Sequence, residues 1–277
     1  MSTNSRLLQI YLIPSILLFL FVSGCAPDNA GWQYYKEIKL KNIHPSGMVV
    51  YKGRIWVTDS TSGLVALCDT AGRQLREFKD FDKPVHPAIF EDRLLVPEFS
   101  SGKVKLIDQK GNVTSFNLIT SPQNISGAGA EAAKLCLADY SSNRIIVQQG
   151  NRAYSFGKKG KSPGELLNPA DAALKDGILY AADAGNRRIQ VFDLAGKSVK
   201  TIGKGEDIPR ISSVTVDDNF VFVTAFNKSD VFVYNLDGKL EQVLEEKISN
   251  PTDTFSTGKY LYVSNYGNGS IIVFERK

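Results

Sequence analysis

The chain has few histidines and cysteines and no strong excess of charge. Its 277 residues include two histidines and three cysteines, and 33 basic against 29 acidic residues give a net charge of +4. This mild charge, without a clustered basic face, argues against nucleic acid binding. Proline and glycine stay below the level of a disordered chain. No Ser/His/Asp triad, phosphate-binding loop or Cys-x-x-Cys motif is visible, so no single stretch indicates a catalytic chemistry.

The first 25 residues have the pattern of an export signal. A short polar start precedes an apolar run, Leu7–Val22, that is too short for a typical membrane-spanning helix and ends in small residues. The end of this segment, Val22-Ser23-Gly24-Cys25, resembles the lipobox of bacterial lipoproteins. The resemblance implies removal of residues 1–24 and acylation of Cys25 on its thiol and its new amine. An uncleaved anchor with a buried cysteine is the alternative.

The lipobox resemblance also implies a cellular location. Ala26 follows the cysteine, where Asp is associated with inner-membrane retention in Gram-negative bacteria. We therefore expect a lipid-anchored extracytoplasmic protein, on the outer membrane and facing the periplasm or the cell surface if the source is Gram-negative. Inner versus outer membrane stays open. Residues 25–31 would form the lipidated cysteine and a short tether.

The stretch from Asn168 to Gly203 shows the repeating unit of the remaining chain. Turn signals at glycine and asparagine separate four strand-like runs, which are Ala170–Leu174, Ile178–Ala182, Arg188–Asp193 and Ser198–Ile202. A four-stranded unit cannot bury both faces alone, so it needs neighbours.

Six copies of this unit follow one another. Their second strands end at matching anchor residues, which are Asp59, Glu98, Asp139, Asp183, Ala225 and Asn265. The sixth copy lacks a fourth strand, and Trp32–Leu40 is a strand without a hairpin partner. We therefore predict an all-β, six-bladed β-propeller of four-stranded antiparallel blades over residues 32–277. The N-terminal strand joins the last blade and closes the ring.

Three segments of the fourth copy resemble the NHL repeat. They are Asn168-Pro169, Leu179–Asp183 and Asn186–Asp193, and the third copy keeps Leu137-Ala138-Asp139 and Asn143-Arg144-Ile145. The resemblance covers about residues 32–277 and implies the propeller architecture. NHL and NHL-like propellers include enzymes, protein-binding modules and RNA-binding modules, so the resemblance implies no particular chemistry.

Cys68 and Cys136 fall in blades one and three. A disulfide between them would have to cross a whole blade, beyond the reach of about 7 Å between Cα atoms. We predict that both are buried and behave as small hydrophobic residues.

His44 and His86 each precede a proline and an innermost strand, and we predict equivalent positions for them at one mouth of the channel. They could be metal ligands or a general base. Alternatively they are ordinary polar residues before this proline, as Asn168 and Asn250 are. No cofactor is predicted, with a divalent cation in the channel as the alternative.

Two acidic residues, Asp171 and Asp253, match in position on the innermost strands of blades four and six. The other blades carry Gly47, Ile89, Gly127 and Ser213 there. The two carboxylates could hold a cation or act in acid–base chemistry. Alternatively they bond the backbone of the next blade or a channel water.

The residue after the anchor is aromatic in four of the six blades. These aromatics are Phe99, Tyr140, Phe226 and Tyr266, in loops that share a face with the segments before the innermost strands. Together with Arg187, Asn168 and Asn250 they are our candidate ligand-binding residues. Packing between adjacent blades is the alternative.

These observations favour a monomeric, membrane-anchored binding scaffold. Its channel-mouth face would recognise a protein, a glycan or a small ligand of the cell envelope. The alternative is a metal-dependent hydrolase or lyase of the lactonase-like or NHL-like propeller type.

Overall fold

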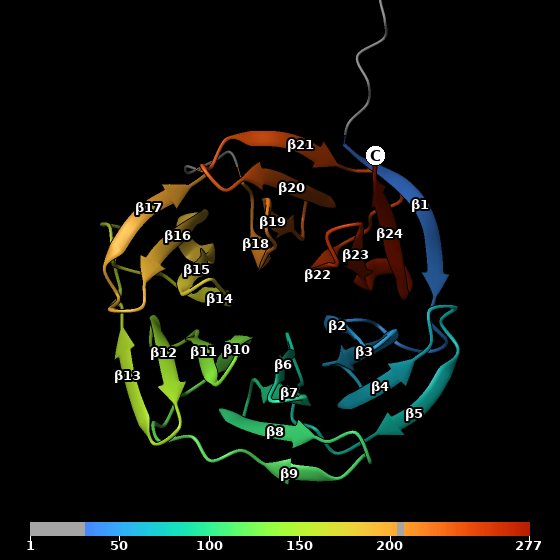
Figure 1. The fold of residues 1–277 in the computed structure, drawn as a ribbon, viewed down its shortest axis with the longest axis horizontal. Coiled ribbons are helices and arrows are strands. Elements are labelled where there is room, and N and C mark those ends of the chain that lie inside the picture. Colours follow the sequence, from blue (N-terminus) through green and yellow to red (C-terminus); the bar gives the residue numbers. More distant parts are fainter. Residues whose placement is uncertain (1–30, 204–207) are drawn as a thin grey trace, which may run out of the picture. The chain divides into compact units, whose positions relative to one another are not determined.

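Six four-stranded antiparallel sheets stand around a central axis (Figure 1). This computed structural model describes residues 31–203 and 208–277. The predicted signal peptide, the lipidation site Cys25 and the tether up to residue 30 lie outside the described residues. Within the described part, the prediction of an all-β propeller with six blades is confirmed.

The innermost strand of each blade lies next to the axis, and its neighbour in the sheet is the next strand along the chain. Alternating residues of this strand are directed to opposite sides, toward the adjacent blades. The innermost strands of blades one to six are β2 (Gly47–Tyr51), β6 (Ala88–Phe90), β10 (Ile125–Glu131), β14 (Pro169–Lys175), β18 (Ile211–Val216) and β22 (Pro251–Ser256).

The second strands are the most completely buried. Each ends at the anchor residue expected from the sequence, so the repeat spacing located all six boundaries. These strands are β3 (Arg54–Asp59), β7 (Arg93–Glu98), β11 (Lys134–Asp139), β15 (Ile178–Asp183), β19 (Phe220–Ala225) and β23 (Tyr260–Asn265).

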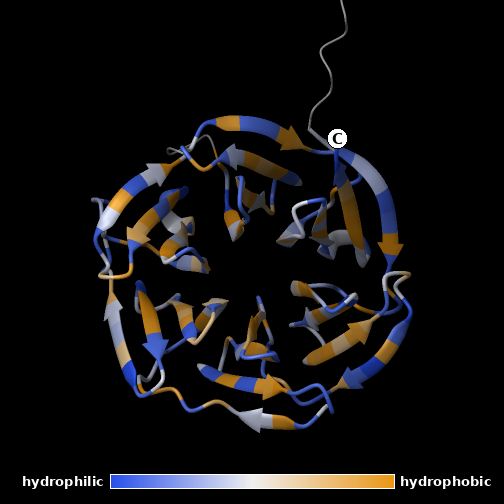
Figure 2. Cartoon of the chain, in the orientation of Figure 1, coloured by the Kyte–Doolittle hydropathy of each residue, from blue (hydrophilic) through white to orange (hydrophobic). Residues whose placement is uncertain are grey.

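The third strands remain apolar, whereas the outer strands are largely exposed. Figure 2 shows mixed polar and apolar residues on the outer ring. The third strands are β4 (Leu64–Cys68), β8 (Lys103–Ile107), β12 (Arg144–Gln149), β16 (Arg188–Asp193), β20 (Asp230–Asn235) and β24 (Ser270–Arg276). The outer strands are β5 (Gln74–Phe78), β9 (Val113–Ser115), β13 (Arg152–Phe156), β17 (Ser198–Ile202), β21 (Leu240–Leu244) and, in blade six, β1 (Trp32–Lys39).

The ring is closed by β1, as predicted. This strand pairs antiparallel with β24, from Trp32 opposite Arg276 to Lys39 opposite Ser270. The Trp32 ring is buried and packs edge-on against Phe222 of blade five, with ring centroids 5.4 Å apart. The closing strand therefore contributes to the hydrophobic core as well as to the sheet.

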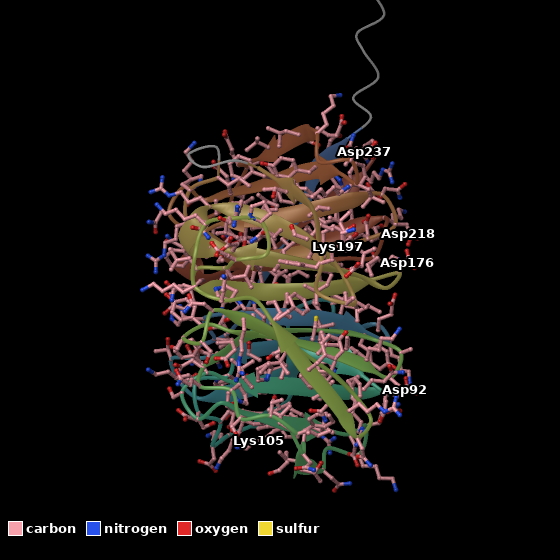
Figure 3. The ribbon with its side chains drawn as sticks, turned by 90° about the vertical axis from the view of Figure 1, so that its left-hand side faces the viewer. Asp92, Lys105, Asp176, Lys197, Asp218 and Asp237 are labelled. Atoms are coloured by element: carbon pink, nitrogen blue, oxygen red, sulfur yellow. The ribbon has the colours of Figure 1, made fainter. Side chains whose placement is uncertain are left out.

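Two faces of the propeller differ in the connections that they carry. Asp92, Asp176 and Asp218, on hairpins between first and second strands, lie at the same side of the molecule in Figure 3. The loops between second and third strands lie on the other side, with the segments that precede the innermost strands. We call that side the mouth face.

Both remaining cysteines are buried and have free thiols, as predicted. Helical structure among the described residues includes two short 3₁₀ turns, Ala184–Asn186 (η1) and Tyr266–Asn268 (η3). No helix within residues 31–203 and 208–277 has the length and apolar character needed to cross a membrane.

Candidate functional site

Each blade places one residue beside the axis, in its innermost strand or just before it, opposite the residue that precedes the anchor, and we call this the axial position. Asp171 is opposite Ala182, the residue before anchor Asp183. Asp253 is opposite Ser264, the residue before anchor Asn265. The predicted equivalence of Asp171 and Asp253 is therefore confirmed by their pairing.

The predicted equivalence of His44 and His86 is wrong. In blade two an isolated bridge joins Pro84 to the anchor Glu98, as Pro169 is joined to Asp183 in blade four. His86 lies two residues after Pro84, as Asp171 lies two residues after Pro169. His86, rather than Ile89, therefore occupies the axial position of blade two.

A spacing in the sequence would have indicated this register. Pro45, Pro169 and Pro251 each stand fourteen residues before their anchors, since 59 − 45, 183 − 169 and 265 − 251 all equal 14. In blade two, Pro84 keeps that spacing, since 98 − 84 = 14, whereas Pro87 does not. The second proline, Pro87, directly follows His86 and so repeats the His44-Pro45 pair in a different register.

Large and small axial residues alternate around the ring. Blades two, four and six carry His86, Asp171 and Asp253, which we call the axial cluster, while blades one, three and five carry Gly47, Gly127 and Ser213. A Cβ atom on Gly47 would lie 2.8 Å from the His86 Cα. Side chains from alternate blades can therefore converge because the intervening positions are small.

Both carboxylates of the axial cluster are buried and accept backbone hydrogen bonds. Asp171 accepts from the N–H of Ala172 (2.8 Å) and from that of Val214 in blade five (3.1 Å). Asp253 accepts from Thr254 (2.8 Å) and from Met48 in blade one (2.9 Å). Each carboxylate thus fastens its blade to the next one, as the structural alternative anticipated, and its orientation is fixed.

His86 completes the cluster. Its Nδ1 atom lies 3.4 Å from Oδ2 of Asp253 but lacks a hydrogen-bond partner of good geometry among the described residues. The ligand atoms of His86, Asp171 and Asp253 all lie within 4.8 Å of one another. An imidazole and two carboxylates so close together could bind a cation or share protons.

The charges in the cluster depend strongly on each other. Burial by itself lowers the pKa of His86, but the carboxylates of Asp253 and Asp171 outweigh this effect and raise that pKa to about 9. Burial raises the pKa of Asp171 to about 7, against the opposing effect of His86 and with the help of Asp253. Without a bound cation, the cluster therefore keeps more protons at neutral pH than isolated side chains would.

A cavity of about 380 Å³ opens above the cluster on the mouth face, and we call it the mouth pocket. Phe99, Tyr140 and Phe226 contribute aromatic surface to its wall, and His86 is also a lining residue. Each of these rings is half-buried. The pocket thus combines an apolar wall with a polar side chain at the axis.

The mouth aromatics also contact one another across blade boundaries. Phe99 and Tyr140 form an edge-to-face pair with ring centroids 5.9 Å apart, and Phe226 and Tyr266 lie 6.2 Å apart. Ring packing between blades and pocket lining were alternatives in the sequence, and Phe99, Tyr140 and Phe226 do both. Tyr266 does not line the mouth pocket.

Beyond the axial cluster, the channel contains a second cavity of about 290 Å³, which we call the opposite cavity. It is lined mainly by apolar residues of the innermost strands, among them Ile89, Leu174 and Phe255. His86 borders both cavities, and Asp171 and Asp253 border the second. The axial cluster therefore lies between the mouth pocket and the opposite cavity.

The other predicted site residues have different surroundings. Asn168 and Asn250 donate their amide N–H groups to the carbonyls of Tyr140 and Phe226, at 3.4 and 3.2 Å, and so connect neighbouring blades. His44 is exposed, and its Nδ1 is 3.2 Å from the Tyr266 carbonyl. Neither asparagine belongs to the axial cluster, although Asn168 lines the mouth pocket. The structure does not bring His44 to the axis.

Arg187 lies in the exposed turn after β15 with a positive φ of 54°. It lines a different surface hollow, with Lys161 and Arg188, and is absent from the lining of the mouth pocket. Its neighbour Arg188 reaches the buried anchor Asp183, with Nε 2.8 Å from Oδ2. The NHL-like Asn-Arg segment of blade four therefore builds this loop.

Comparison with solved structures supports the architecture. A streptogramin B lyase is 14% identical, with a TM-score of 0.65 over 89% of this chain and 98% of that one. A catalytically inactive histidine-to-alanine variant of virginiamycin B lyase from Staphylococcus aureus, solved with quinupristin, is 16% identical, with a TM-score of 0.65 over 88% and 89% of the two chains.

A third similar structure has no known function. It is a protein from Bacteroides thetaiotaomicron, 12% identical, with a TM-score of 0.68 over 90% of this chain and 72% of that one. No protein-family model matches the sequence, and no curated protein matches it significantly. At these identities the likeness concerns the six-bladed propeller fold.

Proposed function

We propose that the propeller binds a compact ligand in the mouth pocket. The observation that carries this proposal is the convergence of Phe99, Tyr140 and Phe226 with His86 on one cavity at the channel axis. Its volume of about 380 Å³ is near the lower end of the range of small-molecule sites. The site therefore suits a small molecule, or the end of a glycan or peptide.

The pocket lining indicates what such a ligand would contain. The half-buried rings offer apolar surface to a ring or hydrocarbon part of the ligand. Arg210 is exposed at the pocket, and its guanidinium lies 5.4 Å from the centre of the Phe226 ring. An acidic group on the ligand would meet this cation at the rim. We therefore favour a partly apolar ligand that carries a carboxylate.

A thermal-shift screen tests this proposal. A chain that begins at Ala26 contains every strand of the propeller and can be screened against uronic acids, aromatic carboxylates and dipeptides. We expect a compound that raises Tm in the wild type and loses this effect in Phe226→Ala and Phe99→Ala. Tyr154→Ala is the control, because Tyr154 lies on outer strand β13. Equal shifts in all variants, or a panel without any mouth-dependent shift, would contradict the proposal.

Catalysis is the second candidate function. Two features favour it: an imidazole borders the pocket beside two carboxylates, and two similar structures are streptogramin lyases, one of them inactivated at a histidine. Quinupristin is a direct probe for a lyase activity of this kind. Conversion of quinupristin by the wild type but not by His86→Ala would establish it. An unchanged compound after prolonged incubation would leave binding as the function.

We also propose that a lipidated Cys25 holds the domain at a membrane outside the cytoplasm. Support comes from the apolar run and the lipobox-like tetrapeptide before this cysteine. Two or three acyl chains on one residue give stable anchoring, where a single chain is marginal. Labelled palmitate should enter the wild type in a bacterial host and should be lost in Cys25→Ala. Equal labelling of the two would refute the anchor.

A further inference from the structure

We propose that the axial cluster is a binding site for one divalent transition-metal ion, with His86, Asp171 and Asp253 as its protein ligands. The ligand set contains an imidazole nitrogen and carboxylate oxygens, which suits Zn²⁺ and its neighbours better than the oxygen-only preference of Mg²⁺ or Ca²⁺. This inference does not depend on the ligand proposed for the mouth pocket.

The spacing of the donor atoms fits such an ion. Two ligand atoms of a tetrahedral Zn²⁺ site with bonds of about 2.1 Å lie about 3.4 Å apart. The His86 Nδ1 and the Asp253 Oδ2 are separated by 3.4 Å. One ligand atom each from His86, Asp171 and Asp253 lies within 4.8 Å of the others, so Asp171 supplies a third donor beside this pair.

The His86 ring supplies an independent observation. Its Nδ1 atom is buried and makes no well-formed hydrogen bond among the described residues, although Asp253 Oδ2 lies 3.4 Å away. A buried polar atom without a partner is unfavourable, and native structures rarely leave one unexplained. A metal ion between the imidazole and the carboxylates would give this nitrogen a directed bond in place of the loose ion pair with Asp253.

Neighbouring backbone groups hold the carboxylates in place for this role. Asp171 and Asp253 each accept N–H groups from their own strand and from the next blade, at Val214 and Met48. One such bond per oxygen leaves lone pairs for a cation. Groups of this kind orient metal ligands in many sites, and losing them weakens metal affinity by about 10–100-fold.

The charge and accessibility of the cluster are also suitable. A neutral imidazole with two ionised carboxylates would have a charge of −2, which a divalent cation neutralises in this buried place. His86 borders both the mouth pocket and the opposite cavity, so water or a ligand atom can approach the ion. Three protein ligands with an open side are typical of functional zinc sites.

Metal titration tests the inference directly. The chain from Ala26 is stripped with EDTA, dialysed, and titrated with Zn²⁺ by calorimetry and with Co²⁺ by visible absorption. We expect one site per chain, and at least a 100-fold loss of affinity in His86→Gln and in Asp253→Asn. His44→Gln is the matched control and should bind as the wild type does, because His44 is exposed on the mouth face.

Two results would overturn the inference. One is a wild type that binds neither ion. The cluster would then have a structural role, in which its side chains share protons and join neighbouring blades. The other is binding that survives in His86→Gln and Asp253→Asn, with circular dichroism showing that both are folded. Because no organic ligand is added, the result is independent of the thermal-shift screen, and either proposal can fail alone.

Discussion

Gly127 of blade three makes room for Asp171 of blade four. A Cβ atom on Gly127 would lie 2.1 Å from Oδ1 of Asp171 and 3.0 Å from its Cα. These distances are far below ordinary contact, so any side chain at position 127 would displace the carboxylate. The geometry of the axial cluster thus depends on Gly127, which has no side chain.

Gly127→Ala should therefore destabilise the propeller. We expect a loss of about 1–3 kcal/mol in the free energy of unfolding, which is typical of overpacking in a core. Urea denaturation measures it. In a double-mutant cycle with Asp171→Ala the losses should be less than additive, because removal of the carboxylate removes most of the clash. Strict additivity would show that the two positions do not interact.

The mouth aromatics should contribute less to stability than a core ring does. Phe226 is half-buried, whereas Phe222 is fully buried. Phe222→Ala should cost about 3–5 kcal/mol, while the loss of a partly exposed ring contact in Phe226→Ala should cost about 1 kcal/mol. Melting temperatures of the two variants compare them directly. A similar loss in both would mean that Phe226 mainly holds the blades together.

Two adjacent arginines in blade four should behave differently on truncation. Arg188 pairs with Asp183, whose side chain is fully buried, and its Nη2 also donates to the carbonyls of Ser162 and Glu165. Arg188→Ala leaves that carboxylate without its cation and should cost about 3 kcal/mol.

Arg187 is the matched control for Arg188. It is exposed and has a positive φ, which glycine adopts without strain. Arg187→Gly should therefore leave the free energy of unfolding unchanged or slightly raise it. If Arg187→Gly were the more damaging variant, the assignment of the anchor ion pair to Arg188 would be wrong.

The buried thiols should make the fold sensitive to alkaline pH. Burial, with a smaller effect of Asp69, raises the pKa of Cys68 to about 11, and burial raises the pKa of Cys136 to about 12. These folded-state pKa values exceed the unfolded value near 9. The stability that the protonated thiols give the folded state is therefore fully present below about pH 9 and is lost as the pH rises toward 11–12.

Urea midpoints at pH 8 and at pH 10.5 measure this effect. The wild type should lose more stability between the two pH values than the double variant Cys68→Ala/Cys136→Ala, which starts lower because of its cavities. In the native state at pH 8 both thiols should also be unreactive toward a thiol reagent, and both should react in urea. Parallel pH slopes for the two chains would refute the role of the thiols.

Much of the fold could be predicted because the repeat has a regular spacing. All six anchors, from Asp59 to Asn265, end their strands as predicted, and the unpaired segment at Trp32 closes the ring. These features can be predicted from the alternation of apolar and polar residues along strands and from turn residues, which are local in sequence. Strand ends differ by about one residue, as at Lys39, where pairing with β24 stops at Ser270.

The candidate site could be predicted only in part. Asp171 and Asp253 were identified because their blades repeat the Asn-Pro segment, and the aromatic loops were placed on the correct face. His86 was assigned to the wrong register because two prolines flank it within four residues. The contact of His86 with two carboxylates joins residues of three blades that lie far apart in the sequence. No local sequence pattern indicates such a contact.

Closure of the ring by β1 has a consequence for the order of folding. The strand pairs Trp32 with Arg276, so it joins segments from opposite ends of the described chain. The entropy of closing this loop must be overcome before the contact stabilises anything, which makes such pairings slow. Until then β24 has a free edge, open to pairing with another chain. We expect pulsed hydrogen exchange to show protection of β24 amides after those of blade four; simultaneous protection would contradict this order. Newly made molecules are therefore most prone to associate with one another in the interval before the first strand meets the last.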